Sequence, residues 1–282
     1  MLSILTNPSL FSGLQTLRNV NARVAESSKA VSTGQKVRGA LDDASNFAIS
    51  QGLRGELRAI DAVIQGLNSA KGVAKVAVAG AEATSDIMND IRKKIIEATN
   101  PGVTTQQRQI LQNDYVDLLG DMRQILENSE FNGLNLLIEI AVPFNLFVGQ
   151  VQNLDVLSNT GGDTVRVGGH RLDLVYARLI NEDLNSVANA NAALNIWDTN
   201  ISFVNIALGD LGADSRQLNF QVDNLAQIRD EVTSGLGNIV DADLARESAK
   251  LAAGQVQQQL SVQTLNIAKA QPSIIQQLFQ QG

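Results

Sequence analysis

Two pairs of closely spaced aspartates are the side chains whose type and spacing could support acid–base chemistry or hold a hard cation. They are Asp42 with Asp43, and Asp241 with Asp243. The second pair precedes a run of helix formers, where carboxylates favour the amide-rich end of a helix, so we predict that it begins a helix. The chain contains no phosphate-binding glycine loop of the P-loop or dinucleotide type, no GxSxG and no HExxH. We therefore predict that it is not an enzyme and that it uses no metal or other cofactor.

Three further features have both a chemical and a structural interpretation. The single histidine, His170, lies beside a predicted hairpin turn, so an exposed strand residue is favoured over a general base. Trp197 falls on a helical apolar seam and is assigned to the core. The basic cluster Arg92-Lys93-Lys94 lies between acidic residues, and Lys93 with Glu97 has the spacing of a helical ion pair. A nucleic-acid site needs more positive charge than this, so we interpret the cluster as a solvated helix face.

The composition excludes several classes of site. Among 282 residues there is no cysteine and one histidine, which rules out thiol nucleophiles, iron–sulfur clusters, disulfides and multi-histidine metal sites. The net charge of −7 argues against attraction to nucleic-acid phosphates. The N-terminus lacks the basic segment and cleavage site of a conventional signal peptide. The most apolar window, Leu134 to Val148, is interrupted and shorter than the roughly 20 residues of a membrane span, so we expect no membrane insertion.

Charged residues are almost missing from both ends of the chain. Residues 1–17 carry none, and residues 251–282 carry only Lys269, although the second segment is rich in glutamine and regularly spaced apolar residues. A solvated tail normally carries charge, so these ends are expected to be buried against another surface. That surface is either another subunit or the other end of the same chain.

Apolar residues recur every three or four positions along most of the sequence, which predicts helices. The first forty residues and those from Asp241 onward have this pattern, and residues 53–95, 111–125 and 197–236 form longer a/d-like seams. Long helices with such seams predict an elongated, coiled-coil-like rod. The positions assigned to the rod core are Leu53, Leu57, Ile60, Ile64, Leu118, Met122, Trp197, Ile201, Leu208, Leu218 and Leu225.

The middle of the chain has a different pattern. Residues 164–167 and 170–175 alternate apolar and polar side chains on either side of Gly168-Gly169, which predicts a β-hairpin with a two-residue turn. Asn132-Gly133, between Phe131 and Leu134, is a second candidate turn. The predicted fold is therefore mainly α, a long antiparallel helical rod or coiled coil with a small β-hairpin patch in the middle of the chain.

Several blocks of sequence resemble a known family in the same order along the chain. Residues 32–37 (STGQKV) and 42–50 (DDASNFAIS) closely resemble the N-terminal block of bacterial flagellins. Residues 130–137 (EFNGLNLL) are similar to the turn that leaves the second rod helix of that family. Residues 241–251 (DADLARESAKL), continuing to Ala268, are similar to its C-terminal block. The resemblance covers about residues 1–140 and 195–282.

The resemblance implies a short flagellin with little or no outer domain. It divides the chain into an N-terminal inner coiled-coil helix and spoke (1–43), N-terminal rod helices (44–137), a small β region (138–178), a C-terminal rod helix (179–240) and a C-terminal inner coiled-coil helix (241–282). The positions expected to form the inner coiled coil are Leu10, Leu14, Leu17, Val24, Val256, Leu260 and Ile267.

As implied by the resemblance, the protein is a structural subunit that polymerises with its own copies into the bacterial flagellar filament for swimming motility. The family is exported through the flagellar type III apparatus, so an extracellular location without a cleaved signal peptide is expected. Expected partners are other flagellin subunits, hook–filament junction proteins, the filament cap and a cytoplasmic export chaperone. The terminal helices are expected to order fully only on incorporation.

Two alternatives stay open at this point. A hook–filament junction protein shares the terminal helices and the export route, whereas a signalling or adaptor coiled coil would have ends that resist proteolysis.

Some flagellins are sensed by an animal innate immune receptor through an Arg-Glu-Leu segment of the rod. The corresponding residues here are Arg92, Lys93 and Lys94, on a rod surface that faces neighbours or the receptor, and this departure predicts weak or absent recognition.

Overall fold

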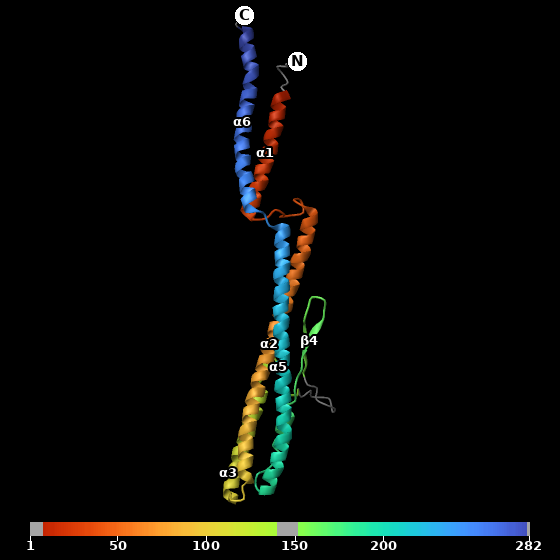
Figure 1. The fold of residues 1–282 in the computed structure, drawn as a ribbon, viewed down its shortest axis with the longest axis vertical. Helices are drawn as coiled ribbons and strands as arrows, with labels where there is room; N and C mark the ends of the chain where they lie inside the picture. The colour runs from red at the N-terminus through yellow and green to blue at the C-terminus, as the bar shows by residue number, and fades with distance from the viewer. Residues whose placement is uncertain (1–7, 140–151, 281–282) are drawn as a thin grey trace. The chain divides into compact units, whose positions relative to one another are not determined.

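The computed structural model describes residues 8–139 and 152–280 (Figure 1). The helices and strands follow the chain in the order α1 (Pro8–Thr33), α2 (Ala44–Thr99), α3 (Thr105–Asn128), β1 (Glu130–Phe131), β2 (Leu134–Asn135), β3 (Leu154–Leu157), β4 (Thr164–Val167), α4 (Asp173–Leu179), α5 (Val187–Val240) and α6 (Leu244–Gln280). The prediction of a mainly helical chain with a small β patch in its middle is confirmed. No helix within the described residues is long and apolar enough to cross a bilayer.

The chain forms two compact units. Residues 1–55 and 231–282 make one, called here the terminal unit, and residues 56–230 make the other, called the central unit. The helix expected over the first forty residues ends at Thr33, and residues 34–43 form a connection without helix. Part of the proposed β region, residues 140–151, lies outside the described residues, and its last part is the helix α4.

Small residues at helical spacing bring the long helices of the central unit together. Ala70, Ala74, Ala77 and Ala81 of α2 are buried, as are the larger Met88, Ile91 and Ile95 farther along the same helix. The indole Nε1 of Trp197 on α5 donates a 2.6 Å hydrogen bond to the Met88 main-chain oxygen on α2, which fixes the two helices against each other. Of the positions assigned to the rod core, Ile60, Met122, Trp197, Leu218 and Leu225 are buried, and Leu53, Leu57, Ile64, Leu118, Ile201 and Leu208 are partly buried.

Helix α2 begins and ends at identifiable polar contacts. The Asp43 carboxylate accepts the Asn46 N–H at 3.0 Å, as a helix N-cap does, and the hydrogen bonds to Asn46 lower its pKa. At the other end, the buried Arg108 guanidinium donates to the main-chain oxygens of Ala98 and Asn100. A cation there stabilises carbonyls that have no partner within the helix.

The two predicted turns have different outcomes. Asn132 and Gly133 both have positive φ, 52° and 78°, and they connect β1 to β2, so the first hairpin is confirmed. The prediction of a hairpin around Gly168-Gly169 is wrong. Strand β4 pairs with β3, which precedes it in the sequence, and not with the residues after Gly169. Residues 170–172 do not fold back on β4 but form backbone hydrogen bonds with residues 136–137. His170 N donates to Leu136 O at 2.6 Å, and Leu172 N donates to Leu137 O at 2.9 Å.

His170 is not the exposed strand residue that its position beside Gly-Gly predicted. Its side chain is 20 % exposed and lies against α5, where Nε2 is 3.8 Å from the nearer Asp210 carboxylate oxygen. Burial lowers the pKa of His170 and outweighs the opposite effect of Asp210 and Asp214. The Gly168 N–H donates a 2.9 Å hydrogen bond to the Asp214 side-chain carboxylate, which holds the same loop on α5.

Candidate functional site

The helices at the two ends of the chain, α1 and α6, lie side by side within the terminal unit (Figure 1). Residues next to them fix the pair at its base. Gln35 pairs antiparallel with Asp241, Lys36 N donates to Val240 O at 2.8 Å, and Ala242 N donates to Gly34 O at 2.8 Å. Gly34 ends α1 with a φ of 70°, a left-handed conformation that glycine adopts without strain. The packing of one end of the chain on the other, left open by the sequence, therefore occurs within a single chain.

The start of α6 agrees with the prediction made for its aspartates. The Asp243 carboxylate accepts the Arg246 N–H at 3.0 Å, so Asp243 caps the helix that begins at Leu244. Asp42, from the other aspartate pair, forms a 2.9 Å ion pair with Arg38, which lowers its pKa. Within the described ranges, no three histidine, aspartate or glutamate side chains come together as a metal site. The aspartate pairs thus have structural contacts.

Small residues let α1 and α6 approach closely. A β-carbon on Gly254 would lie 2.7 Å from Val24 Cγ2, and one on Gly13 would lie 2.9 Å from Leu265 Cδ2. Val20 and Leu265 are buried at this seam, 3 % and 7 % exposed. Each glycine therefore receives a larger apolar side chain from the opposite helix, at two separate levels of the pair.

Two hydrogen bonds between polar side chains connect α1 and α6 along the seam. Ser27 on α1 donates a 3.0 Å hydrogen bond to Glu247 on α6, and Gln258 on α6 donates a 2.9 Å hydrogen bond to Asn21 on α1. Glu247 also forms a 2.6 Å ion pair with Lys250. The hydrogen bonds that Glu247 accepts from Lys250, the larger effect, and from Ser27 lower its pKa. These bonds specify which residues of the two helices lie opposite each other.

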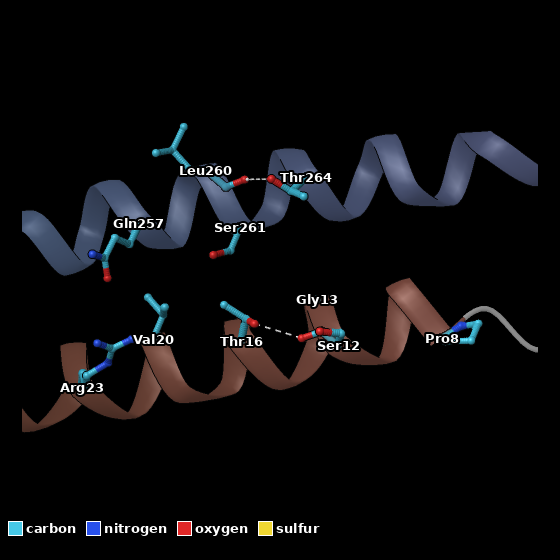
Figure 2. A pocket seen from close by; sticks show the side chains of 10 residues that line it. All are labelled: Pro8, Ser12, Gly13, Thr16, Val20, Arg23, Gln257, Leu260, Ser261 and Thr264. Carbon is cyan, nitrogen blue, oxygen red and sulfur yellow. Dashed lines mark hydrogen bonds between the residues drawn. The ribbon is translucent and has the colours of Figure 1, made fainter.

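The residues predicted for the inner coiled coil fall into two groups. Leu10, Leu17 and Val24 are partly buried on α1, and Leu14 is 37 % exposed. On α6, Val256, Leu260 and Ile267 do not form the seam with α1, because they are 55 %, 55 % and 67 % exposed. At about 100° per residue they lie on the side of α6 opposite to Gly254 and Leu265. Figure 2 shows Leu260 directed away from α1.

Sequence reasoning missed the residues that form the seam and several that form the exposed apolar surface. Gly13 and Val20 are seven positions apart on α1, and Gly254 and Leu265 are eleven positions apart on α6, so each pair lies on one helix face. The available signal was a glycine and an apolar residue sharing that face. Phe11 and Val262 are 63 % and 44 % exposed in the same two uncharged segments. Beside this seam α1 and α6 border a groove, lined by Pro8, Ser12, Gly13, Thr16, Val20, Arg23, Gln257, Leu260, Ser261 and Thr264 (Figure 2).

The basic cluster of α2 is held by its own chain. Arg92 lies over the Trp197 ring at 4.7 Å and within 3.9 Å of Asp198, and Lys94 forms a 2.7 Å ion pair with Asp114. Lys93 is exposed, and the predicted Lys93–Glu97 ion pair is absent from the described residues. The cluster is therefore partly paired, through residues on α3 and α5 and not along α2.

Known proteins resemble this chain over both of its terminal regions. Residues 4–141 match the bacterial flagellin N-terminal helical region, and residues 194–279 match the bacterial flagellin C-terminal helical region. The chain is 28 % identical over 278 residues to flagellin FljM of Caulobacter vibrioides, and the match covers 98 % of each chain. It is 29 % identical over 284 residues to a flagellin of Brucella melitensis, covering 99 % of each. The crystal structure of Bacillus cereus flagellin shares the fold with a TM-score of 0.51 at 21 % identity, covering 57 % of this chain and 88 % of the other.

Proposed function

The chain belongs to the bacterial flagellin family and is a structural subunit of the flagellar filament, not an enzyme, and we propose that its α1–α6 pair joins one subunit to the next. Flagellins occupy the filament and polymerise with their own copies. The matched regions and the full-length relatives are flagellins, so the hook–filament junction alternative has no specific support. The finer assignment of the joining surface is our inference.

The observation that carries this proposal is the outward apolar face of α6. Val256, Leu260 and Ile267 remain exposed after α1 has packed on the other side of the helix. Exposed apolar side chains that share one helix face, in a segment with almost no charge, are typical of a surface covered by a partner. In a homopolymer that partner is another copy of the chain, and covering about three such side chains contributes several kcal/mol per contact.

Seeded polymerisation tests the function directly. Purified monomer is added to short filament fragments of the same protein, and elongation is followed by negative-stain microscopy. Growth of the fragments supports the assignment. Failure of the unaltered chain to elongate any seed would contradict it.

Variants on α6 test the surface. Replacing Val256, Leu260 and Ile267 by Ser, Gln and Asn removes the outward apolar face but leaves the seam residues Gly254 and Leu265 untouched. We expect elongation to stop while the helical content of the monomer is unchanged. The matched control replaces the same three residues by Ile, Met and Leu, which keeps the face apolar and should keep elongation. Equal elongation by both variants would show that the face is not a subunit contact.

We also propose the remaining steps that the family membership implies. The protein is exported without a cleaved signal peptide, with a chaperone covering the α6 surface before export, and is added beneath the filament cap onto hook–filament junction proteins. The intact mass of the filament protein tests the first point, because a cleaved leader would shorten the N-terminus. The proposed chaperone contact is tested by adding the chaperone to a seeded elongation reaction. The chaperone should slow the addition of monomer, and the polar variant of Val256, Leu260 and Ile267 should bind it more weakly.

A further inference from the structure

Charge is divided unequally between the two units of the chain. Lysine and arginine outnumber aspartate and glutamate by nine to seven in residues 1–55 and 231–282, a net charge of +2. In residues 56–230 there are 13 basic and 22 acidic side chains, a net charge of −9. The net charge of −7 therefore belongs entirely to the central unit. Central units of neighbouring copies repel one another, whereas a terminal unit and a central unit attract.

Four of the nine basic side chains of the terminal unit line one pocket at the base of the α1–α6 pair. Four cations line it, Arg23, Lys36, Arg38 and Lys250, together with two acids, Glu26 and Glu247. We call it the basic pocket. It lies beside the Ser27–Glu247 hydrogen bond, so both helices and the connection after α1 contribute to it.

Two of the four cations of the basic pocket are paired with acids of their own chain, Lys250 with Glu247 at 2.6 Å and Arg38 with Asp42 at 2.9 Å. The other two, Lys36 and Arg23, have no acidic partner within the described residues. Lys36 Nζ donates to the Asn238 main-chain oxygen at 2.9 Å, and Arg23 Nε donates to the Asn19 main-chain oxygen, so both are held by uncharged groups. Arg38 uses Nε and Nη2 on Asp42, and among the described residues its buried Nη1 has no hydrogen-bond partner. The accessible groups are therefore the exposed Arg23 guanidinium and the exposed Lys36 ammonium, and both are suited to a carboxylate.

We propose that the basic pocket receives carboxylates from the central unit of a second copy of this chain. The inference rests on the proposed function and adds a second, electrostatic contact to the apolar one on α6. The contact reduces the repulsion between subunits whose central units are strongly acidic, because each carboxylate that enters a basic pocket meets positive charge. The same contact also favours one relative placement of two subunits over others.

Zero-length crosslinking tests the contact itself. A carbodiimide joins lysine Nζ to a carboxylate at ion-pair distance, and filaments grown from mixed 14N- and 15N-labelled subunits distinguish links between copies from links within one. We expect a link between copies from Lys36 or Lys250 to an aspartate or glutamate within residues 56–230. The Lys250–Glu247 link within one chain, at 2.6 Å, is the internal positive control. If that control forms and no link between copies involves the basic pocket, the inference is wrong.

Seeded elongation measures how much the basic pocket contributes to the rate of polymerisation. Arg23→Gln with Lys250→Gln removes two charges from the basic pocket, and Arg18→Gln with Lys269→Gln removes two exposed charges elsewhere in the terminal unit. At low salt we expect the first variant to elongate roughly 3- to 10-fold more slowly than the second. About 0.5 M NaCl should remove most of this difference by screening. Arg23→Lys with Lys250→Arg should restore the rate.

The outcomes separate this inference from the proposed function. If the unaltered chain elongates and the two glutamine variants elongate equally, the basic pocket is not a subunit contact although the protein polymerises. If the charge-conserving variant is as slow as the glutamine variant, packing and not charge is responsible, which also overturns the inference. If the unaltered chain does not elongate at all, the proposed function itself fails.

Discussion

The Tyr115 hydroxyl on α3 donates a 2.6 Å hydrogen bond to the main-chain oxygen of Leu179, the last residue of α4. Both residues are fully buried, although 64 positions separate them in the sequence. Gln112, one turn earlier on α3, accepts the Leu184 N–H at 2.6 Å. These two bonds attach the segment after the β patch to the helices of the central unit.

Removing the Tyr115 hydroxyl should destabilise the central unit. In Tyr115→Phe the Leu179 oxygen stays buried and loses a partner, so the free energy of unfolding should fall by about 1–3 kcal/mol. Urea unfolding monitored by Trp197 fluorescence measures it. Tyr176→Phe is the control, since that side chain is only partly buried, and we expect a loss below about 0.5 kcal/mol. Equal losses in both variants would contradict the assigned role.

The same tyrosine predicts a loss of stability at high pH. Burial, and secondarily the charge of Glu182, raises the Tyr115 pKa above its usual value near 10. Above that value the unfolded chain loses the phenol proton while the folded chain keeps it, so stability decreases as pH rises. Between about pH 9 and pH 11 the unaltered protein should lose about 1 kcal/mol more than Tyr115→Phe. Parallel pH profiles for the two proteins would show that Tyr115 ionises normally.

Two helical glycines of the terminal unit should respond in opposite ways to alanine. Nothing lies within 4 Å of a β-carbon on Gly235, so Gly235→Ala should stabilise its helix by about 1 kcal/mol. On Gly254 the β-carbon would lie 2.7 Å from Val24 Cγ2, and the cost of overpacking, about 1–3 kcal/mol, should exceed the gain in helix propensity. Thermal unfolding followed by circular dichroism compares them. A higher midpoint for both variants would mean that the seam is loose.

The helices could be predicted from the sequence, and the core positions assigned on α2, α3 and α5 are buried or partly buried, but the face that α6 turns to α1 could not be predicted. Helix starts such as Asp43 and Asp243, and the confirmed Asn132-Gly133 turn, depend on local chemistry that a short window contains. After Lys250, helix α6 carries only one charged side chain, Lys269, so its periodicity cannot distinguish the face of Leu265 from that of Leu260. That difference is decided by α1, about 240 residues away in the sequence.

The prediction of a hairpin at Gly168-Gly169 failed for a related reason. Gly168-Gly169 has the local signature of a hairpin turn, but the pairing of β4 is decided by a competing turn at residues 158–163. There the Asn159 side chain accepts the N–H groups of Gly161 and Asp163, and Gly162 has a φ of 100°. Strand β3, only four residues long, had too little alternation to be recognised.

Acid should weaken the loop that carries His170. Its pKa in the folded chain is lowered by burial, so as pH falls through the usual value near 6.5 the unfolded chain binds the proton first. Stability is therefore lost on going from about pH 7.5 to pH 5.5, and His170→Gln should remove that part of the loss. Because the chain has one histidine, its imidazole NMR signal reports the pKa directly. A pKa above 6.5 would show that Asp210 and Asp214 outweigh burial.

Recognition by the animal innate immune receptor for flagellins should be weak or absent. Where the recognised segment has an acidic and an apolar residue, this chain has Lys93 and Lys94, and Lys94 is held by Asp114. Purified monomer should therefore fail to activate reporter cells that carry the receptor. Lys93→Glu with Lys94→Leu should raise activation, whereas the matched change Lys71→Leu with Lys75→Glu, elsewhere on α2, should not. Strong activation by the unaltered monomer would mean that the two lysines are tolerated and that other residues of the surface determine recognition.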